Sequence, residues 1–203
     1  VGDGFYSAAG DNGRAACGTG ANTGGSTTSV AVSACICSTG NYGDASSGND
    51  CSQCGSNSNT VNENSNSRTI SDCLCDGGYY TTSSGTACEV VGDGFYSPAL
   101  NNDRTACTNG ASTASATTST DISACICRAG YYGDAATSGS VCTACTDSSY
   151  TPNTNSNDRN ANDCEACTTG YYGTATASTS NANCNSCAAG YYATGSVSAE
   201  SGC

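Results

Sequence analysis

The stretch Cys164-Glu-Ala-Cys167-Thr-Thr-Gly170-Tyr-Tyr172 decides how this chain folds, because variants of it recur along the whole sequence. With valine in place of the second cysteine, the same order opens the segment Val91-Gly-Asp-Gly94-Phe-Tyr96. We take the second cysteine of each pair as the start of a small unit and expect the glycine three residues later to form a turn with positive φ. The aromatic pair then begins a short strand, with one ring facing in and one facing out.

The unit starts divide the chain into a tandem array with two periods. Units are 16–22 residues long, and they begin at Val1, Cys17, Cys37, Cys54, Cys75, Val91, Cys107, Cys127, Cys145, Cys167 and Cys187. Five units make a long repeat, because Val1–Ser7 returns as Val91–Ser97 at an offset of 90 residues. We therefore assign residues 1–90 and 91–186 to two long repeats and residues 187–203 to a partial third. Units this short cannot bury a face alone and must pack on their neighbours.

Composition excludes a conventional hydrophobic core. Leu, Ile, Val and Phe contribute only 16 of 203 residues, a proportion that is typical of disordered chains. The chain has 18 cysteines, however, which is close to the density of disulfide-stapled proteins. Helix formers such as Leu, Glu and Lys are scarce, whereas Gly, Asn, Asp and Ser favour turns. The sequence predicts a small disulfide-rich fold, an elongated tandem array of Cys-rich units with short β-hairpins and little helix.

The repeat also indicates how the cysteines pair. The unit that opens at Val91 lacks both its opening cysteine and the closing one expected near Arg104, and the unit at Val1 shows the same double absence. Both members of a presumptive bond are missing together, which favours a sequential scheme. In that scheme the opening cysteine of each unit bonds the first cysteine of the next boundary. It pairs Cys17–Cys35, Cys37–Cys51, Cys54–Cys73, Cys75–Cys88, Cys107–Cys125, Cys127–Cys142, Cys145–Cys164, Cys167–Cys184 and Cys187–Cys203.

Three alternatives to this pairing remain. Bonds inside each Cys-x-x-Cys pair would leave Cys17, Cys88, Cys107 and Cys203 without partners. Cys203 fits equally as the opening cysteine of a further unit. Zinc sites made of four cysteines need no histidine, but the unequal spacing and the Ser/Thr/Asn/Gly-rich composition favour disulfides.

Charge and cysteine usage restrict location and partners. Disulfides persist in oxidising compartments, so we expect an extracellular or cell-surface protein. A net charge of −12 argues against nucleic-acid binding and against attachment to anionic lipid, and no apolar run is long enough for direct membrane insertion. We expect no cofactor and no metal, since no calcium-loop motif is present. Because the chain starts at Val1 without a signal peptide, we expect a processed product or part of a longer polypeptide.

Aromatic residues and hydroxyl-rich loops supply the remaining candidate sites. We expect the aromatic pairs to form the packing between units: Phe5, Tyr6, Tyr42, Tyr79, Tyr80, Phe95, Tyr96, Tyr131, Tyr132, Tyr171, Tyr172, Tyr191 and Tyr192. A row of exposed tyrosines that binds glycan or another chain is the alternative. The loops 23–29 and 112–120 suit O-glycosylation, with Thr27, Thr28, Thr117 and Thr118 as candidates. For the Asn-rich stretches 57–66 and 153–162 we expect Asx-turns rather than side-chain ladders.

The boundaries Cys164–Tyr172 and Cys184–Tyr192 resemble the growth-factor-receptor cysteine-rich superfamily. They are most similar to its ephrin-receptor-like repeats and to the immobilisation-antigen-type surface proteins of ciliates. This resemblance implies extracellular rods held by a ladder of disulfides. The Cys-x-Cys boundaries and the cysteine-free units at Val1 and Val91 depart from that pattern.

Two functions follow as expectations. The first is a non-enzymatic structural protein, a subunit of a surface coat or of an extracellular fibre that associates with itself or with other surface proteins and with glycans. The second is a ligand-binding or adhesive ectodomain or stalk. No histidine, no lysine and no Gly-x-Ser-x-Gly motif is present, and tandem repetition argues against a single grafted catalytic site.

Overall fold

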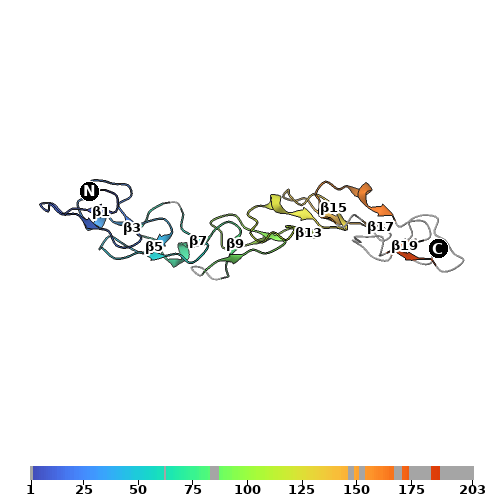
Figure 1. Cartoon of the computed structure of the whole chain (residues 1–203), viewed down its shortest axis with the longest axis horizontal. Coiled ribbons are helices and arrows are strands. Elements are labelled where there is room, and N and C mark those ends of the chain that lie inside the picture. The colour runs from blue at the N-terminus through green and yellow to red at the C-terminus, as the bar shows by residue number, and fades with distance from the viewer. Residues whose placement is uncertain are drawn as a thin grey trace. The chain divides into compact units, whose positions relative to one another are not determined.

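The computed structural model describes residues 2–61, 63–82, 87–145, 149–150, 154–166, 171–173 and 184–187. These residues form ten two-stranded antiparallel hairpins, five in each long repeat, which follow one another along the chain (Figure 1). The predicted fold class, a small disulfide-rich array of short hairpins, is therefore confirmed.

The five hairpins of the first long repeat have strands of two residues each. They pair β1 (Phe5–Tyr6) with β2 (Ala15–Ala16), β3 (Ala21–Asn22) with β4 (Ile36–Cys37), β5 (Asn41–Tyr42) with β6 (Ser52–Gln53), β7 (Ser58–Asn59) with β8 (Leu74–Cys75) and β9 (Tyr79–Tyr80) with β10 (Glu89–Val90).

The second long repeat has the same order. It pairs β11 (Phe95–Tyr96) with β12 (Thr105–Ala106), β13 (Ala111–Ser112) with β14 (Ile126–Cys127), β15 (Tyr131–Gly133) with β16 (Cys142–Ala144), β17 (Ser149–Tyr150) with β18 (Glu165–Ala166) and β19 (Tyr171–Gly173) with β20 (Cys184–Ser186).

A glycine in the left-handed region precedes the first strand of most hairpins. The motif glycines Gly4, Gly40, Gly78, Gly94 and Gly130 have φ between +79° and +85°, which confirms the predicted turn. The carbonyl of Gly4 accepts the N–H of Cys17 at 2.9 Å, and the carbonyl of Gly78 accepts the N–H of Val91 at 3.0 Å. The first residue of a unit thus closes the hairpin of the unit before it.

Four short 3₁₀ turns are the helical elements of the described residues. They are η1 (Val32–Ala34), η2 (Ile70–Asp72), η3 (Ile122–Ala124) and η4 (Ala161–Asp163). Each ends directly before a cysteine that closes a disulfide loop of 18 or 19 residues, whereas the described residues of the loops of 13 to 15 residues form none. The additional residues of the longer loops are therefore taken up by one 3₁₀ turn.

The core consists mainly of sulfur and small side chains. One cluster contains Cys35, Cys37, Ala45 and Cys51, and a second contains Ala111, Cys125, Cys127, Ala135 and Cys142. The clusters lie in two compact units of the chain, residues Val1–Val91 with Ser97–Arg104 and residues Gly92–Tyr96 with Thr105–Cys203. Cystines thus occupy the positions that large aliphatic side chains hold in most domains.

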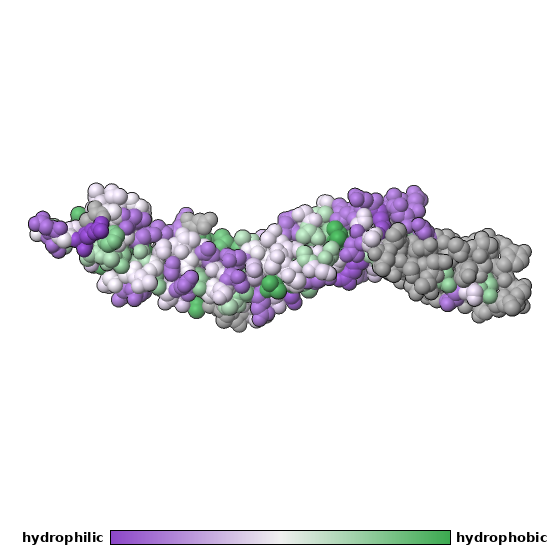
Figure 2. Space-filling model, viewed as in Figure 1, coloured by the Kyte–Doolittle hydropathy of each residue, from purple (hydrophilic) through white to green (hydrophobic). Residues whose placement is uncertain are grey.

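The described surface is largely polar. Hydrophobic residues are scattered over the visible face rather than gathered in one patch (Figure 2). The most exposed large ones are Val30 and Val141, with 69% and 61% of their surface accessible. Within the described residues no helix is long and apolar enough to cross a membrane.

Candidate functional site

Seven disulfides join cysteine pairs of the described residues. They are Cys17–Cys35, Cys37–Cys51, Cys54–Cys73, Cys75–Cys88, Cys107–Cys125, Cys127–Cys142 and Cys145–Cys164. These are pairs of the sequential scheme, each closing one unit. Cys184 and Cys187 are also disulfide-bonded, but the predicted bonds Cys167–Cys184 and Cys187–Cys203 include cysteines that lie outside the described residues.

Tyrosine rings of the aromatic pairs pack against both cystine clusters. Tyr6 packs on the cluster around Cys35, whereas Tyr96 and Tyr131 pack on the cluster around Cys125. These rings are half-buried, as are the other described aromatic side chains of the candidate set, Phe5, Tyr42, Tyr79, Tyr80, Phe95 and Tyr132. For Tyr171 and Tyr172 the structure describes the backbone, and Tyr191 and Tyr192 lie outside the described residues.

The cysteine-free unit that begins at Val91 is held by another means. Val91 is fully buried at the position where other units have their opening cysteine. Arg104, which stands near the missing closing cysteine, donates a hydrogen bond from Nη1 to the Val91 carbonyl at 2.8 Å. The guanidinium carbon of Arg104 also lies 4.2 Å from the centroid of the Tyr80 ring. The hydrogen bond therefore connects the two positions that lack sulfur, and the cation–π contact joins Arg104 to the preceding β9–β10 hairpin.

An aspartate of each cysteine-free unit clamps the next unit. Asp93 Oδ1 accepts hydrogen bonds from the N–H and hydroxyl of Thr113 at 3.0 and 3.1 Å and from the N–H of Ser115 at 3.1 Å. In the first long repeat, Asp3 Oδ1 accepts the corresponding bonds from Thr23 at 2.9 and 3.0 Å. The recurring Val-Gly-Asp-Gly segment is thus a connector between hairpins.

These hydrogen bonds also determine how the two carboxyl groups titrate. The N–H and hydroxyl of Thr23 hold the pKa of Asp3 below its ordinary value. Burial by itself would raise the pKa of Asp93. The hydrogen bonds from Ser115 and Thr113, together with the positive charge of Arg128, outweigh burial and lower that pKa as well. Both clamps therefore favour the ionised carboxylate.

Asparagine side chains form a second kind of link between units. Asn66 accepts the backbone N–H groups of Cys37 and Ala45 at 3.0 Å each and donates to the Cys35 carbonyl at 2.8 Å. Asn157 makes the same three bonds one long repeat later, and Asn102 accepts the N–H of Cys75 at 3.1 Å. Each of these carboxamides therefore accepts the backbone N–H of the cysteine that opens a preceding unit.

The expectation of Asx-turns in the Asn-rich stretches is wrong for most of the described residues. Asn64, Asn66, Asn155 and Asn157 bind backbone N–H groups 21 to 30 residues away instead of their own turns. Asn160, which caps the 3₁₀ turn η4, forms a turn of the expected kind. The carboxamides satisfy backbone groups that stacking of the units leaves unpaired, a need that is not visible in the local sequence.

The sequence did contain a signal for these links. Four of the five arginines stand two residues after an asparagine, at Asn12-Gly-Arg14, Asn66-Ser-Arg68, Asn102-Asp-Arg104 and Asn157-Asp-Arg159. Arg68 is buried and donates to the Thr60 hydroxyl and to the Val61 and Glu63 carbonyls, which fixes the loop that carries Asn66. The recurring Asn-x-Arg motif therefore marks, in the sequence, the segments that form the links between units.

Buried threonines complete the contacts between units. The Thr23, Thr60 and Thr113 hydroxyls accept the N–H groups of Gly4, Gly40 and Gly94, at 3.3, 2.9 and 3.1 Å. The O-glycosylation candidates are different residues of the same loops: the side chains of Thr27, Thr28, Thr117 and Thr118 are exposed.

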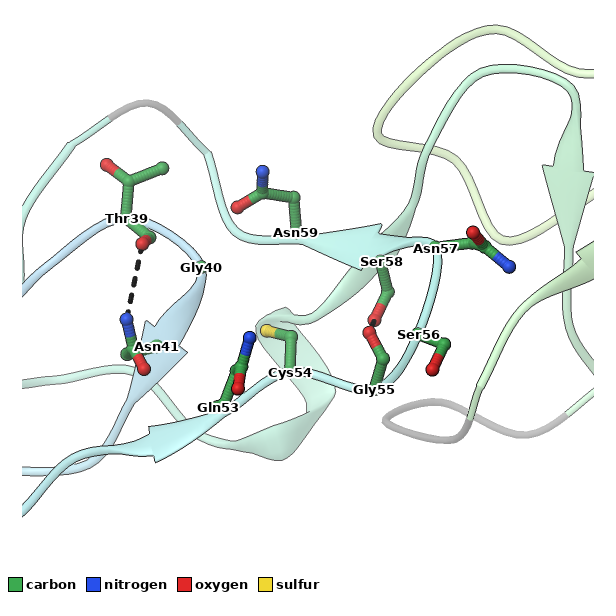
Figure 3. A pocket seen from close by; sticks show the side chains of 10 residues that line it. All are labelled: Thr39, Gly40, Asn41, Gln53, Cys54, Gly55, Ser56, Asn57, Ser58 and Asn59. Carbon is green, nitrogen blue, oxygen red and sulfur yellow. Dashed lines mark hydrogen bonds between the residues drawn. The ribbon is translucent and has the colours of Figure 1, made fainter. Parts of the chain in front are cut away.

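A polar groove of about 460 Å³ lies between the β5–β6 hairpin and the strand β7 (Figure 3). Its lining, residues 39–41 and 53–59, consists of backbone, hydroxyl and carboxamide groups around Cys54, with no charged side chain. The Asn41 carboxamide donates to the Thr39 carbonyl at 3.3 Å, and the Ser58 hydroxyl donates to the Gly55 carbonyl at 2.7 Å. Such a surface offers hydrogen bonds to an uncharged polar ligand.

Comparison with known proteins adds no family. No protein-family model matches the chain, and no curated protein matches it significantly.

Proposed function

We propose that this chain is a non-enzymatic structural protein, a subunit of a surface coat or of an extracellular fibre. The observation that carries the proposal is repetition at two scales: a short antiparallel hairpin recurs every 16–22 residues, and the residues of its contacts recur every long repeat. A protein built in this way presents equivalent surfaces at regular intervals. Regularly spaced equivalent surfaces support repeated contacts in a lattice or filament.

The many disulfides are typical of extracellular or secreted proteins. The partners that we propose are other copies of the chain or other surface proteins, and glycans. The resemblance of the Cys-x-x-Cys-x-x-Gly-Tyr-Tyr boundaries to ephrin-receptor-like repeats and ciliate surface antigens supports the same location. The negative charge supports the absence of nucleic-acid partners.

Concentration-dependent assembly tests the structural role. Purified oxidised chain should form larger species as its concentration rises in sedimentation velocity, and electron microscopy should show ordered filaments or sheets. A chain that remains monomeric over the accessible concentrations contradicts the proposal. Reduced and alkylated chain is the matched control, since it has the same sequence without the disulfide-closed units.

The second candidate, a ligand-binding or adhesive ectodomain, is favoured by the polar groove at residues 39–59. An uncharged lining of hydroxyl and carboxamide groups is suited to a neutral saccharide. Binding to a panel of immobilised neutral glycans should be weakened by Gln53→Ala if the groove is the site. Thr28→Ala, which changes an exposed loop outside the groove, is the control.

O-glycosylation belongs to the structural proposal. We place it at Thr27, Thr28, Thr117 and Thr118, whose exposed side chains are open to a glycosyltransferase. Intact-mass measurement of material from its natural source, before and after O-glycan removal, should show a loss of sugar mass that maps to these two loops. A mass equal to that of the bare polypeptide would contradict it.

A further inference from the structure

We call the residues Ser7, Gly10, Asn12 and Arg14 the receiving face. In the second long repeat, the residues at the equivalent positions bind the hairpin that precedes them. There the Asn102 carboxamide and the Leu100 N–H bind the N–H and the carbonyl of Cys75, at 3.1 and 2.8 Å. The Gly78 and Thr81 N–H groups bind the Ser97 and Asn102 carbonyls, at 2.8 and 3.0 Å. These bonds dock the β9–β10 hairpin on residues 97–104.

The receiving face has the same sequence features and the same internal hydrogen bonds. Residues 1–17 and 91–107 are identical at 12 of 17 positions, among them serine, asparagine and arginine of the face. The Ser7 hydroxyl donates to the Gly13 carbonyl at 2.7 Å, as the Ser97 hydroxyl does to the Asp103 carbonyl. Gly10 has φ +85° where Leu100 has φ +59°. The loop is therefore preformed in the shape that holds a hairpin.

The two loops differ in what covers them. Ser97 is fully buried and Asn102 is half-buried beneath the β9–β10 hairpin. In the first long repeat Ser7 is half-buried and Asn12 is exposed. Arg14 lies over the Phe5 ring of its own hairpin at 4.4 Å, whereas Arg104 reaches the tyrosine of the docked hairpin.

The Cys-x-Cys boundaries between units indicate which kind of hairpin binds the receiving face. Asn66, Asn102 and Asn157 each bind the N–H of a cysteine that opens its unit after a Cys-x-Cys boundary: Cys37, Cys75 and Cys127. These are all the Cys-x-Cys boundaries of the chain, and each is matched by one Asn-x-Arg segment 27 to 30 residues later. The Asn12-Gly-Arg14 segment is the fourth.

We infer that the receiving face is a docking surface for one further disulfide-closed hairpin, whose unit opens after a Cys-x-Cys boundary. The same polypeptide carries this hairpin ahead of Val1, in the way that the hairpin ending at Val90 precedes Val91. A covalently linked hairpin is favoured over a separate molecule because the contacts are few. A few contacts can hold a hairpin that a short covalent connection keeps at high effective concentration. They cannot hold a separate molecule in free solution. The inference does not depend on assembly into a coat or fibre.

An extended chain tests this docking surface directly. Residues 54–90 are repeated ahead of Val1, which adds two complete disulfide pairs and recreates the junction of Val90 with valine. Hydrogen exchange is then followed at the amide of the added copy of Cys75. This amide should exchange at least tenfold more slowly than in the extended Asn12→Ala variant, and about as slowly as the original Cys75 amide in the same molecule.

The control variant is Asn49→Ala, which changes an exposed asparagine outside the receiving face and should leave that exchange rate unchanged. Equal exchange with and without Asn12→Ala would overturn the inference. So would a loss of self-association caused by Asn12→Ala in the unextended chain, because the occupant would then be another molecule. Intact mass of every variant, before and after reduction, establishes that all disulfides have formed.

Discussion

At the scale of single residues, close approach between units depends on glycines that no other residue replaces well. A Cβ atom on Gly110 would lie 2.4 Å from the Tyr131 ring, and φ there is +78°. Gly139 has a similar φ of +84° but open space around its Cα. Substitutions at these two positions therefore distinguish the cost of backbone strain alone from the cost of strain combined with a packing clash.

We predict that Gly110→Ala is more destabilising than Gly139→Ala. Both substitutions incur about 1–2 kcal/mol for a left-handed alanine, and Gly110→Ala adds roughly 1–3 kcal/mol because the Tyr131 ring must move. Denaturant unfolding with intact disulfides measures the difference. Equal losses would mean that Tyr131 does not pack on Gly110 in solution.

The aspartate clamps predict that stability depends on pH. Asp3 and Asp93 have lowered pKa values in the folded chain, so their contribution is complete above the unfolded value of about 3.9 and is lost as pH falls through the folded pKa. The melting temperature should therefore fall as the pH drops below about 4. Asp93→Asn should lower it at pH 7 and flatten the acid decline. An unchanged decline in Asp93→Asn and in its counterpart Asp3→Asn would contradict the clamp.

At the scale of elements, each hairpin is too small to be stable alone, and its neighbours supply the missing hydrogen bonds. The cysteine-free unit at Val91 shows this most clearly, since a buried valine and an arginine stand at the two positions where other units have their disulfide, and the arginine also lies over a tyrosine ring of the preceding hairpin.

We predict that Arg104→Ala destabilises the β11–β12 hairpin by about 1–2 kcal/mol through loss of one hydrogen bond and one cation–π contact. Arg14→Ala is the matched control. It removes the same charge at the equivalent position of the first long repeat, where Arg14 lies over the Phe5 ring, and it should leave hydrogen exchange around Val91 unchanged. Hydrogen exchange at the Val91 and Cys107 amides reports the local effect. An equal effect of the two substitutions on these amides would contradict it.

The asparagine links predict a specific chemical requirement. Asn66 uses its carboxamide oxygen for two N–H groups and its nitrogen for one carbonyl. Asn66→Ala leaves those groups unsatisfied and should cost about 1–3 kcal/mol. Asn66→Asp keeps the acceptor but sets a carboxylate against the Cys35 carbonyl, so it should recover only part of the loss. Full recovery would show that the bond to Cys35 is unimportant.

At the scale of the whole molecule, disulfide bonds provide the stability that a hydrophobic core provides in most domains. Each loop of 13 to 19 residues stabilises the fold by roughly 3 kcal/mol through restriction of the unfolded chain. Hydrophobic burial is correspondingly small, since the buried apolar residues are mostly cysteine with a few alanines and Val91.

We predict that reduction unfolds the chain, whereas a metal chelator leaves it folded. On reduction the intact mass should increase by one hydrogen for each of the 18 cysteines, and the circular dichroism spectrum should become that of an unfolded chain. Thiols that react with an alkylating reagent before reduction, or a metal released by the chelator, would contradict this account.

Features with a fixed spacing along the chain were predictable before the structure. Unit length, the positive-φ glycines, the hairpins and the pairing of the described cysteines all depend on residues at most about 20 positions apart. The roles of Asn66, Thr23 and Asp93 depended on the folded arrangement. Their partners are backbone N–H groups in a neighbouring unit, and stacking determines which of those groups lack a strand partner. Short covalent loops are encoded locally, whereas satisfying buried polar groups is a property of packed neighbours.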